Sequence, residues 1–186
     1  SMVLRASDGF ECDAYVAQPN KPPRAALVVL QEIFVVNPHI RAIADGFAMV
    51  GFLVIAPATF SRLQRHVNLG YSDADVVKGR EFKTLAEALP APGVMADVQA
   101  AVTHGSLACK GKVGVVGYCM GGALALVAAA RRPDSVAACA PYYGVIGWPS
   151  AQPDWSRLAA KVVGEYAEHD DYAGPDASAA FQQTLR

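Results

Sequence analysis

The sequence lacks the features that mark several large classes of protein. It carries 16 Lys and Arg residues against 17 Asp and Glu residues, so no excess of basic charge favours binding to nucleic acid. Its longest apolar runs fall well short of the roughly 18 residues that a membrane-spanning helix requires. Its first residues do not resemble a signal peptide. We therefore expect a cytoplasmic protein with neither a nucleic-acid partner nor a membrane partner.

Cysteine and histidine are sparse and scattered. The four cysteines form no CxxC pair, which argues against a disulfide framework. The four histidines are not spaced as metal ligands. We expect no metal and no cofactor. Cys12, Cys109 and Cys139 are interpreted as small buried hydrophobes or incidental surface thiols. Only Cys119 lies in a sequence context that favours a catalytic role.

The 186 residues alternate between short apolar runs and helical patterns, which is typical of a mostly parallel sheet flanked by helices. Neither an internal repeat nor a linker is visible, so we predict a single α/β domain over residues 1–186. Residues 58–80 show little periodicity and are predicted to form a surface loop. Strands are expected at residues 10–16, 25–30, 52–56, 113–116, 136–140 and 161–166, and helices at residues 38–50, 95–104, 121–131 and 176–185.

One short segment predicts a catalytic nucleophile. Residues 117–121, GYCMG, follow the β-branched run 113–116 and precede the helix-forming run 122–130. A strand, a tight Gly-x-nucleophile-x-Gly turn and a helix make up the nucleophile elbow of α/β-hydrolases. The turn also places Cys119 at a helix N-terminus, which favours thiolate over thiol. The sequence therefore predicts Cys119 as the nucleophile of an α/β-hydrolase fold.

The acid and the base of a triad follow the nucleophile along the chain in this fold. The predicted strand 161–166 leads to Asp170 and Asp171. Either carboxylate could orient an imidazole, and we favour Asp170; capping of a turn is the alternative. No histidine present is convincing as the base. The histidines considered are His39, His66, His104 and His169. We expect the catalytic base to lie beyond Arg186, together with the last strand and helix of the fold.

An oxyanion hole requires two backbone N–H groups aimed at the developing charge. The fold supplies one from the residue after the nucleophile, here Met120, and one from the loop after an early strand, here residues 31–34. Glu32 directly follows the apolar run 27–30, at the edge where open α/β sheets bind ligands. We interpret Glu32 as an active-site acid that holds Cys119 as a neutral thiol until substrate arrives. A solvent-exposed acid is the alternative.

Four segments together resemble the dienelactone hydrolase family, and the resemblance covers essentially the whole chain. They are the block QEIF at residues 31–34, Asn37, the elbow GYCMGG at residues 117–122, and YYGV at residues 142–145. The QEIF block combined with a cysteine elbow is far more specific than either alone. The resemblance implies a single α/β-hydrolase domain, incomplete at its C-terminus as the sequence stands.

The resemblance also implies a role for individual residues. Cys119 matches the family's nucleophile, and Asp170 matches its acid. Glu32 matches a glutamate that modulates the cysteine. The backbone N–H groups of Ile33 and Met120 match the oxyanion donors.

The sequence departs from the family pattern at two places. Val35 stands where the family often has glycine, which adds bulk beside the oxyanion loop. The family's arginine for the substrate carboxylate has no clean match: Arg80 is the candidate, with Arg62 and Arg65 as rivals and surface charge as the alternative. Together with Arg80, Tyr143 is predicted to contact the substrate.

These expectations combine into one predicted function. The resemblance implies a carboxylic ester hydrolase of the carboxymethylenebutenolidase type, acting on a small ester or lactone through a Cys-His-Asp triad and an acyl-thioester. The same nucleophile is expected to attack activated aryl esters or phosphotriesters. A non-catalytic binding protein of the same fold and a cysteine redox sensor are the alternatives. Either a monomer or a homodimer is compatible with the sequence.

Overall fold

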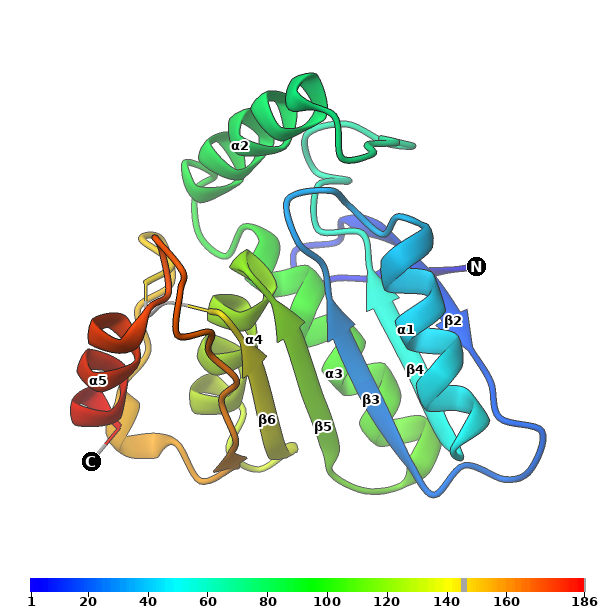
Figure 1. Cartoon of the computed structure of the whole chain (residues 1–186). Helices are drawn as coiled ribbons and strands as arrows, with labels where there is room; N and C mark the ends of the chain where they lie inside the picture. Colours follow the sequence, from blue (N-terminus) through cyan, green and yellow to red (C-terminus); the bar gives the residue numbers. More distant parts are fainter. Residues whose placement is uncertain (145–146, 186) are drawn as a thin grey trace.

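A seven-stranded sheet forms the centre of the computed structural model, which describes residues 1–144 and 147–185 (Figure 1). Its strand order is β1-β2-β4-β3-β5-β6-β7. The first two strands pair antiparallel at one edge, and the strands from β3 onward run parallel. The strands are β1 (Met2–Arg5), β2 (Glu11–Ala17), β3 (Ala25–Leu30), β4 (Phe52–Pro57), β5 (Val113–Tyr118), β6 (Val136–Tyr142) and β7 (Lys161–Val162). The predicted mostly parallel α/β sheet is thus confirmed.

Helices cover both faces of the sheet. Helix α1 (Pro38–Met49) packs on β2 and β4 from one side, whereas α3 (Val94–Cys109) and α4 (Met120–Arg131) pack on the other (Figure 1). Strand β3 is a continuous apolar run because both of its faces are buried. Val28 and Leu30 join the core beneath α3 and α4, and Val29 joins the smaller core beneath α1.

Helix α2 (Asp73–Glu87) corrects the expectation of a loop over residues 58–80. The helix begins at a capping box, in which Ser72 and Asp75 satisfy each other's backbone N–H groups. This pattern of Ser and an acid three residues later is a recognised start signal. Figure 1 shows α2 above the carboxyl ends of the parallel strands, so the helix lies over the edge where the sequence places the site.

Smaller differences concern the ends of the sheet. Strand β1 was not expected, and α3 continues to Cys109, beyond the predicted end. The strand predicted at residues 161–166 forms only β7, and Glu165 adds an isolated bridge to Tyr142. The remaining helical elements are η1 (Trp155–Arg157) and α5 (Pro175–Thr184). Within the described ranges, no helix combines the length and the apolar character that crossing a membrane would require.

Candidate active site

Cys119 occupies the sharp turn between β5 and α4 that the sequence predicts. Its backbone has φ 55°, a left-handed conformation that costs a non-glycine residue free energy and often marks a functional position. A β-carbon at Gly117 would collide with the carbonyl oxygen of Gly121, so the turn cannot close without glycine there. The Cys119 N–H donates to the carbonyl oxygen of Tyr142 at 3.0 Å, which ties the turn to β6.

The turn packs directly against the end of β3. Leu30 and Gly117 are paired in neighbouring parallel strands. A β-carbon at Gly121 would lie 2.5 Å from the carbonyl oxygens of Leu30 and Gln31, so only glycine permits this approach. The start of α4 and the loop after β3 are therefore neighbours. These are the two segments that carry the predicted oxyanion donors, Met120 and Ile33.

The thiol of Cys119 is partly exposed, yet burial raises its pKa above the ordinary cysteine value. A hydrogen bond with the Met120 N–H acts in the opposite direction, as expected at a helix N-terminus. The charge of Glu32 raises the pKa further. Burial therefore outweighs the helix terminus, and together with the charge of Glu32 it favours the neutral thiol at Cys119.

Glu32 is held by Tyr143, which lies 111 residues later in the chain. The Tyr143 hydroxyl donates to Glu32 Oε1 at 2.9 Å, and the Tyr143 N–H donates to the Glu165 carbonyl oxygen at 2.7 Å. Burial and the hydrogen bond with Glu32 raise the pKa of Tyr143, so its hydroxyl keeps its proton. Tyr143 therefore faces the site, with its hydroxyl engaged by a carboxylate.

The loop after β3 is fixed from several sides. Gln31 is fully buried; its Nε2 donates to the Glu32 carbonyl oxygen, and its Oε1 accepts from the Thr59 N–H, both at 3.2 Å. From above, α2 packs on Ile33 so closely that a β-carbon at Gly79 would lie 2.7 Å from the Ile33 carbonyl oxygen. Val35, at φ 65°, adopts a left-handed conformation that suits the glycine of the family pattern.

The two candidate acids differ in structure. Asp170 Oδ1 accepts from the N–H groups of Tyr172 and Ala173 at 2.7 and 2.9 Å, and these bonds lower its pKa. Asp170 is partly buried, and its charge acts on the thiol of Cys119. Asp171 is exposed. The two hydrogen bonds are those of the turn-capping alternative, and the role of Asp170 as the triad acid stays a prediction.

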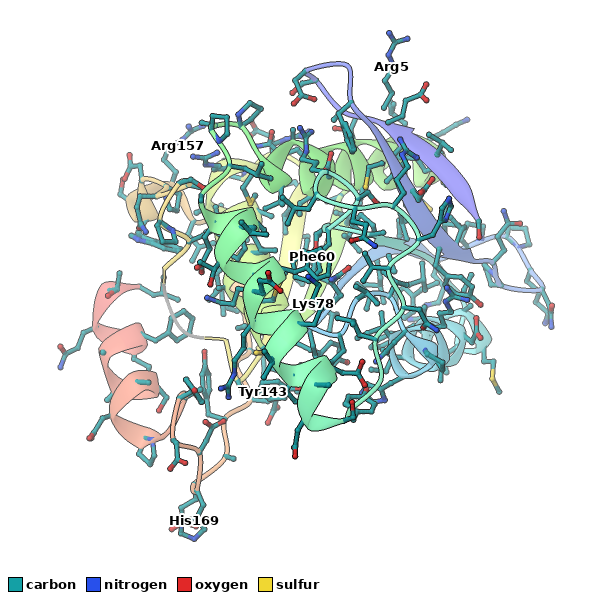
Figure 2. The ribbon with its side chains drawn as sticks, turned by 90° about the horizontal axis from the view of Figure 1, so that it is seen from above. Arg5, Phe60, Lys78, Tyr143, Arg157 and His169 are labelled. Atoms are coloured by element: carbon teal, nitrogen blue, oxygen red, sulfur yellow. The ribbon has the colours of Figure 1, made fainter. Side chains whose placement is uncertain are left out.

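The four histidines have different surroundings. His39, His66 and His169 are exposed, and His104 lies on α3 at a cavity beside β1. Figure 2 shows His169 projecting outward at the edge of the molecule. No hydrogen bond within residues 1–144 and 147–185 joins a histidine to Cys119 or Asp170.

The three arginine candidates for contact with the substrate carboxylate differ in their own contacts. Arg62 bonds to Asp8 and to the fully buried Asp97, and Arg65 bonds to β2. Both guanidinium groups are therefore occupied by the fold itself. Arg80 is exposed on α2, and its predicted contact with substrate stays a prediction.

Lys83 is a candidate that sequence reasoning missed. It lies on α2, partly buried, and forms an ion pair with Glu87. Its positive charge lowers the pKa of Cys119, against the larger effect of burial. The sequence analysis predicted a loop up to residue 80 and no helix directly after it, so neither α2 nor the side chains that it brings over the site were anticipated. The capping box at Ser72 was the available signal.

The sheet order and the cysteine elbow define a protein of the α/β-hydrolase fold. The chain belongs to the dienelactone hydrolase family, whose sequence model matches residues 12–186. It is 32% identical over 144 residues to a carboxymethylenebutenolidase of Pseudomonas putida, covering 76% of this chain and 59% of that protein. The chain spans between 59% and 69% of the length of the curated relatives that it matches.

Solved structures agree with this membership. A protein of Klebsiella pneumoniae subsp. pneumoniae, named "Putative Dienelactone Hydrolase", superposes with a TM-score of 0.79 at 28% identity, over 100% of this chain and 78% of that one. The dienelactone hydrolase-like promiscuous phosphotriesterase P91 from metagenomic libraries gives a TM-score of 0.71 at 22% identity, over 100% and 75%. At that identity the second likeness shows the fold alone.

Proposed function

We propose that this protein is a hydrolase of the dienelactone hydrolase type that cleaves a small ester or lactone through Cys119. The observation that carries the proposal is the position of Cys119 in a left-handed turn at the start of α4. The thiol is partly exposed there, beside the loop that carries Glu32 and Ile33. A strained cysteine between a helix N-terminus and a second loop of N–H groups is suited to covalent acyl transfer.

In the proposed reaction the deprotonated sulfur of Cys119 attacks the carbonyl carbon of the substrate. The N–H groups of Ile33 and Met120 stabilise the negative charge that forms on the carbonyl oxygen. The C–O bond then breaks, the leaving alkoxide takes up a proton, and an acyl-thioester remains on the enzyme. Water hydrolyses the thioester to the carboxylic acid and regenerates the thiol.

Glu32 and Tyr143 are proposed to control when the thiolate forms. The negative charge of Glu32 raises the pKa of the thiol, and Tyr143 holds that carboxylate in place through its hydroxyl. A bound substrate that displaces Glu32 would remove this penalty and favour ionisation of Cys119. The enzyme would thus keep its nucleophile neutral between turnovers, which also limits oxidation of the sulfur.

Asp170 is proposed as the acid of a Cys-His-Asp triad because its N–H partners hold it ionised. Its histidine partner is expected from the family likeness beyond Arg186. For the substrate, a carboxylate-bearing ester or lactone is proposed, with Arg80 or Lys83 of α2 as the cation that receives it. Phosphotriesters are a second substrate class to test, because the same nucleophile could attack an activated phosphorus centre.

The decisive experiment measures acylation of the thiol, because this step reports on the nucleophile directly. We would mix the protein with an activated aryl ester and follow phenol release together with intact mass. The acyl adduct is expected in the native protein and in Cys109→Ala, a control at another partly buried cysteine. It should be absent in Cys119→Ala. Equal phenol release from both variants would refute the proposal.

A further inference from the structure

A cavity lies outside the carboxyl ends of β3 and β4, and Cys119 is not part of its wall. Its volume is about 230 Å³. Gln31 and Val35 of the β3–α1 connection form one side, and Phe60 and Ser61 of the connection after β4 form another. The proposed acyl-transfer chemistry uses none of this space.

The fold itself creates this crevice. The chain leaves β3 for α1 on one face of the sheet, and leaves β4 towards α3 on the opposite face (Figure 1). Where neighbouring parallel strands send their connections to opposite faces, a crevice opens outside their carboxyl ends, and open α/β sheets bind ligands in such crevices. The cavity therefore occupies a position suited to a small molecule.

The charges on the wall favour an anion. Arg41 Nε donates to the Val36 carbonyl oxygen at 3.0 Å, and the guanidinium lies 5.6 Å from the centre of the Tyr15 ring. No described hydrogen bond uses the terminal nitrogens of Arg41, so they can form a charge-assisted pair with a ligand. The carboxylate of Asp13, also on the wall, is paired with Arg65 at 3.3 Å.

The rest of the wall favours an apolar body. Val35 and Phe60 are buried core residues whose side chains border the space. The volume corresponds to about eight waters at roughly 30 Å³ each, which is the size of a small ring bearing one acidic group.

We propose that this cavity binds a small carboxylate with an apolar body, whose charge pairs with Arg41. Gln31 and Val35 stand on either side of Glu32 and Ile33 in the sequence. A ligand in this cavity would therefore contact the loop that borders the active site. The site is separate from the nucleophile, so the proposal does not rest on the proposed esterase activity.

Calorimetric titration with benzoate tests the proposal, with benzyl alcohol as the uncharged probe. The native protein should bind benzoate and bind benzyl alcohol much more weakly. Arg41→Gln should weaken benzoate binding by about ten-fold or more, and Arg41→Lys should retain part of it. The matched control is Arg157→Gln, an exposed arginine that is not part of the cavity wall.

One further arm excludes the active site as the place of binding. Alkylation of Cys119 with iodoacetamide fills the space at the nucleophile, and benzoate should still bind the alkylated protein. Loss of binding on alkylation would overturn the proposal, because the ligand would then lie in the catalytic site. Equal affinity in Arg41→Gln and the native protein, or no benzoate binding at millimolar concentration, would also overturn it.

Discussion

Replacing Gly79 by alanine tests the contact that presses α2 onto the oxyanion loop. A β-carbon there would lie 2.7 Å from the Ile33 carbonyl oxygen and 3.1 Å from its Cβ and Cγ1. The first distance is shorter than real β-carbon contacts, and the partner is backbone, so either α2 or the loop must move. Gly46 offers a matched control, because it also lies inside a helix and a β-carbon there would meet nothing within 4 Å.

The two substitutions should change stability in opposite directions. Alanine in place of glycine inside a helix stabilises by about 0.5–1 kcal/mol, and Gly46→Ala should show this gain. At Gly79 the same gain is opposed by an overpacking cost of about 1–3 kcal/mol. We therefore expect Gly79→Ala to be less stable than Gly46→Ala by about 1–3 kcal/mol.

Urea unfolding measures the stabilities, and the burst of phenol release from an aryl ester measures acylation. Gly79→Ala should also acylate more slowly, because a displaced Ile33 moves its N–H from the oxyanion position. Removal of one oxyanion donor costs on the order of 100- to 1,000-fold, so a displacement should cost less than this. If the two variants are equally stable and equally fast, α2 does not lie against Ile33 as described.

Three further substitutions test charge and burial. Glu32→Gln removes the negative charge that raises the pKa of the Cys119 thiol. The alkylation rate of Cys119 should therefore rise at a lower pH in this variant than in the native protein. An unchanged pH profile of alkylation would contradict this. Thr59→Val replaces a buried hydroxyl that has no hydrogen-bond partner among the described residues and should raise the free energy of unfolding by about 1 kcal/mol; a decrease would contradict this. Arg62→Met leaves the fully buried Asp97 unpaired and should lower the free energy of unfolding by about 3 kcal/mol at pH 7. Arg65 is more exposed, so Arg65→Met should lower it by less than about 1 kcal/mol. Equal losses of stability in the two variants would contradict the difference in burial.

The local parts of the site could be predicted from the sequence. The turn at Cys119 depends on a strand, two glycines and a helix that are adjacent in the chain, so a pattern of a few residues specifies it. The QEIF block likewise follows its strand directly. Their packing against each other follows from the pairing of β3 with β5, which the fold class implies.

Long-range features were not predictable in the same way. The hydrogen bond between Tyr143 and Glu32 joins residues 111 positions apart, and no local pattern encodes it. The pKa of Cys119 is another case. The helix N-terminus is visible in the sequence, but burial, which has the larger effect, depends on the assembled core. Lys83 was missed because no helix was predicted over residues 73–87, where hydrophobic periodicity is weak.

Val35 joins the sequence argument to the structure in a way that stability measurements can test. A β-branched residue at φ 65° is strained, and such strain costs about 1–3 kcal/mol. The side chain is buried, and full burial of a valine contributes about 1.5–3 kcal/mol. Val35→Gly loses the free energy of side-chain burial but also removes the backbone strain. Val35→Ala loses most of the burial energy and keeps the strain.

The glycine variant should therefore be at least as stable as the alanine variant in urea unfolding. This order reverses the usual one, in which alanine is favoured because glycine loses more conformational entropy on folding. An alanine variant more stable than the glycine variant would show that this loop does not adopt a left-handed turn. The packing inferred for Glu32 and Ile33, which precede Val35 in the same loop, would then need revision.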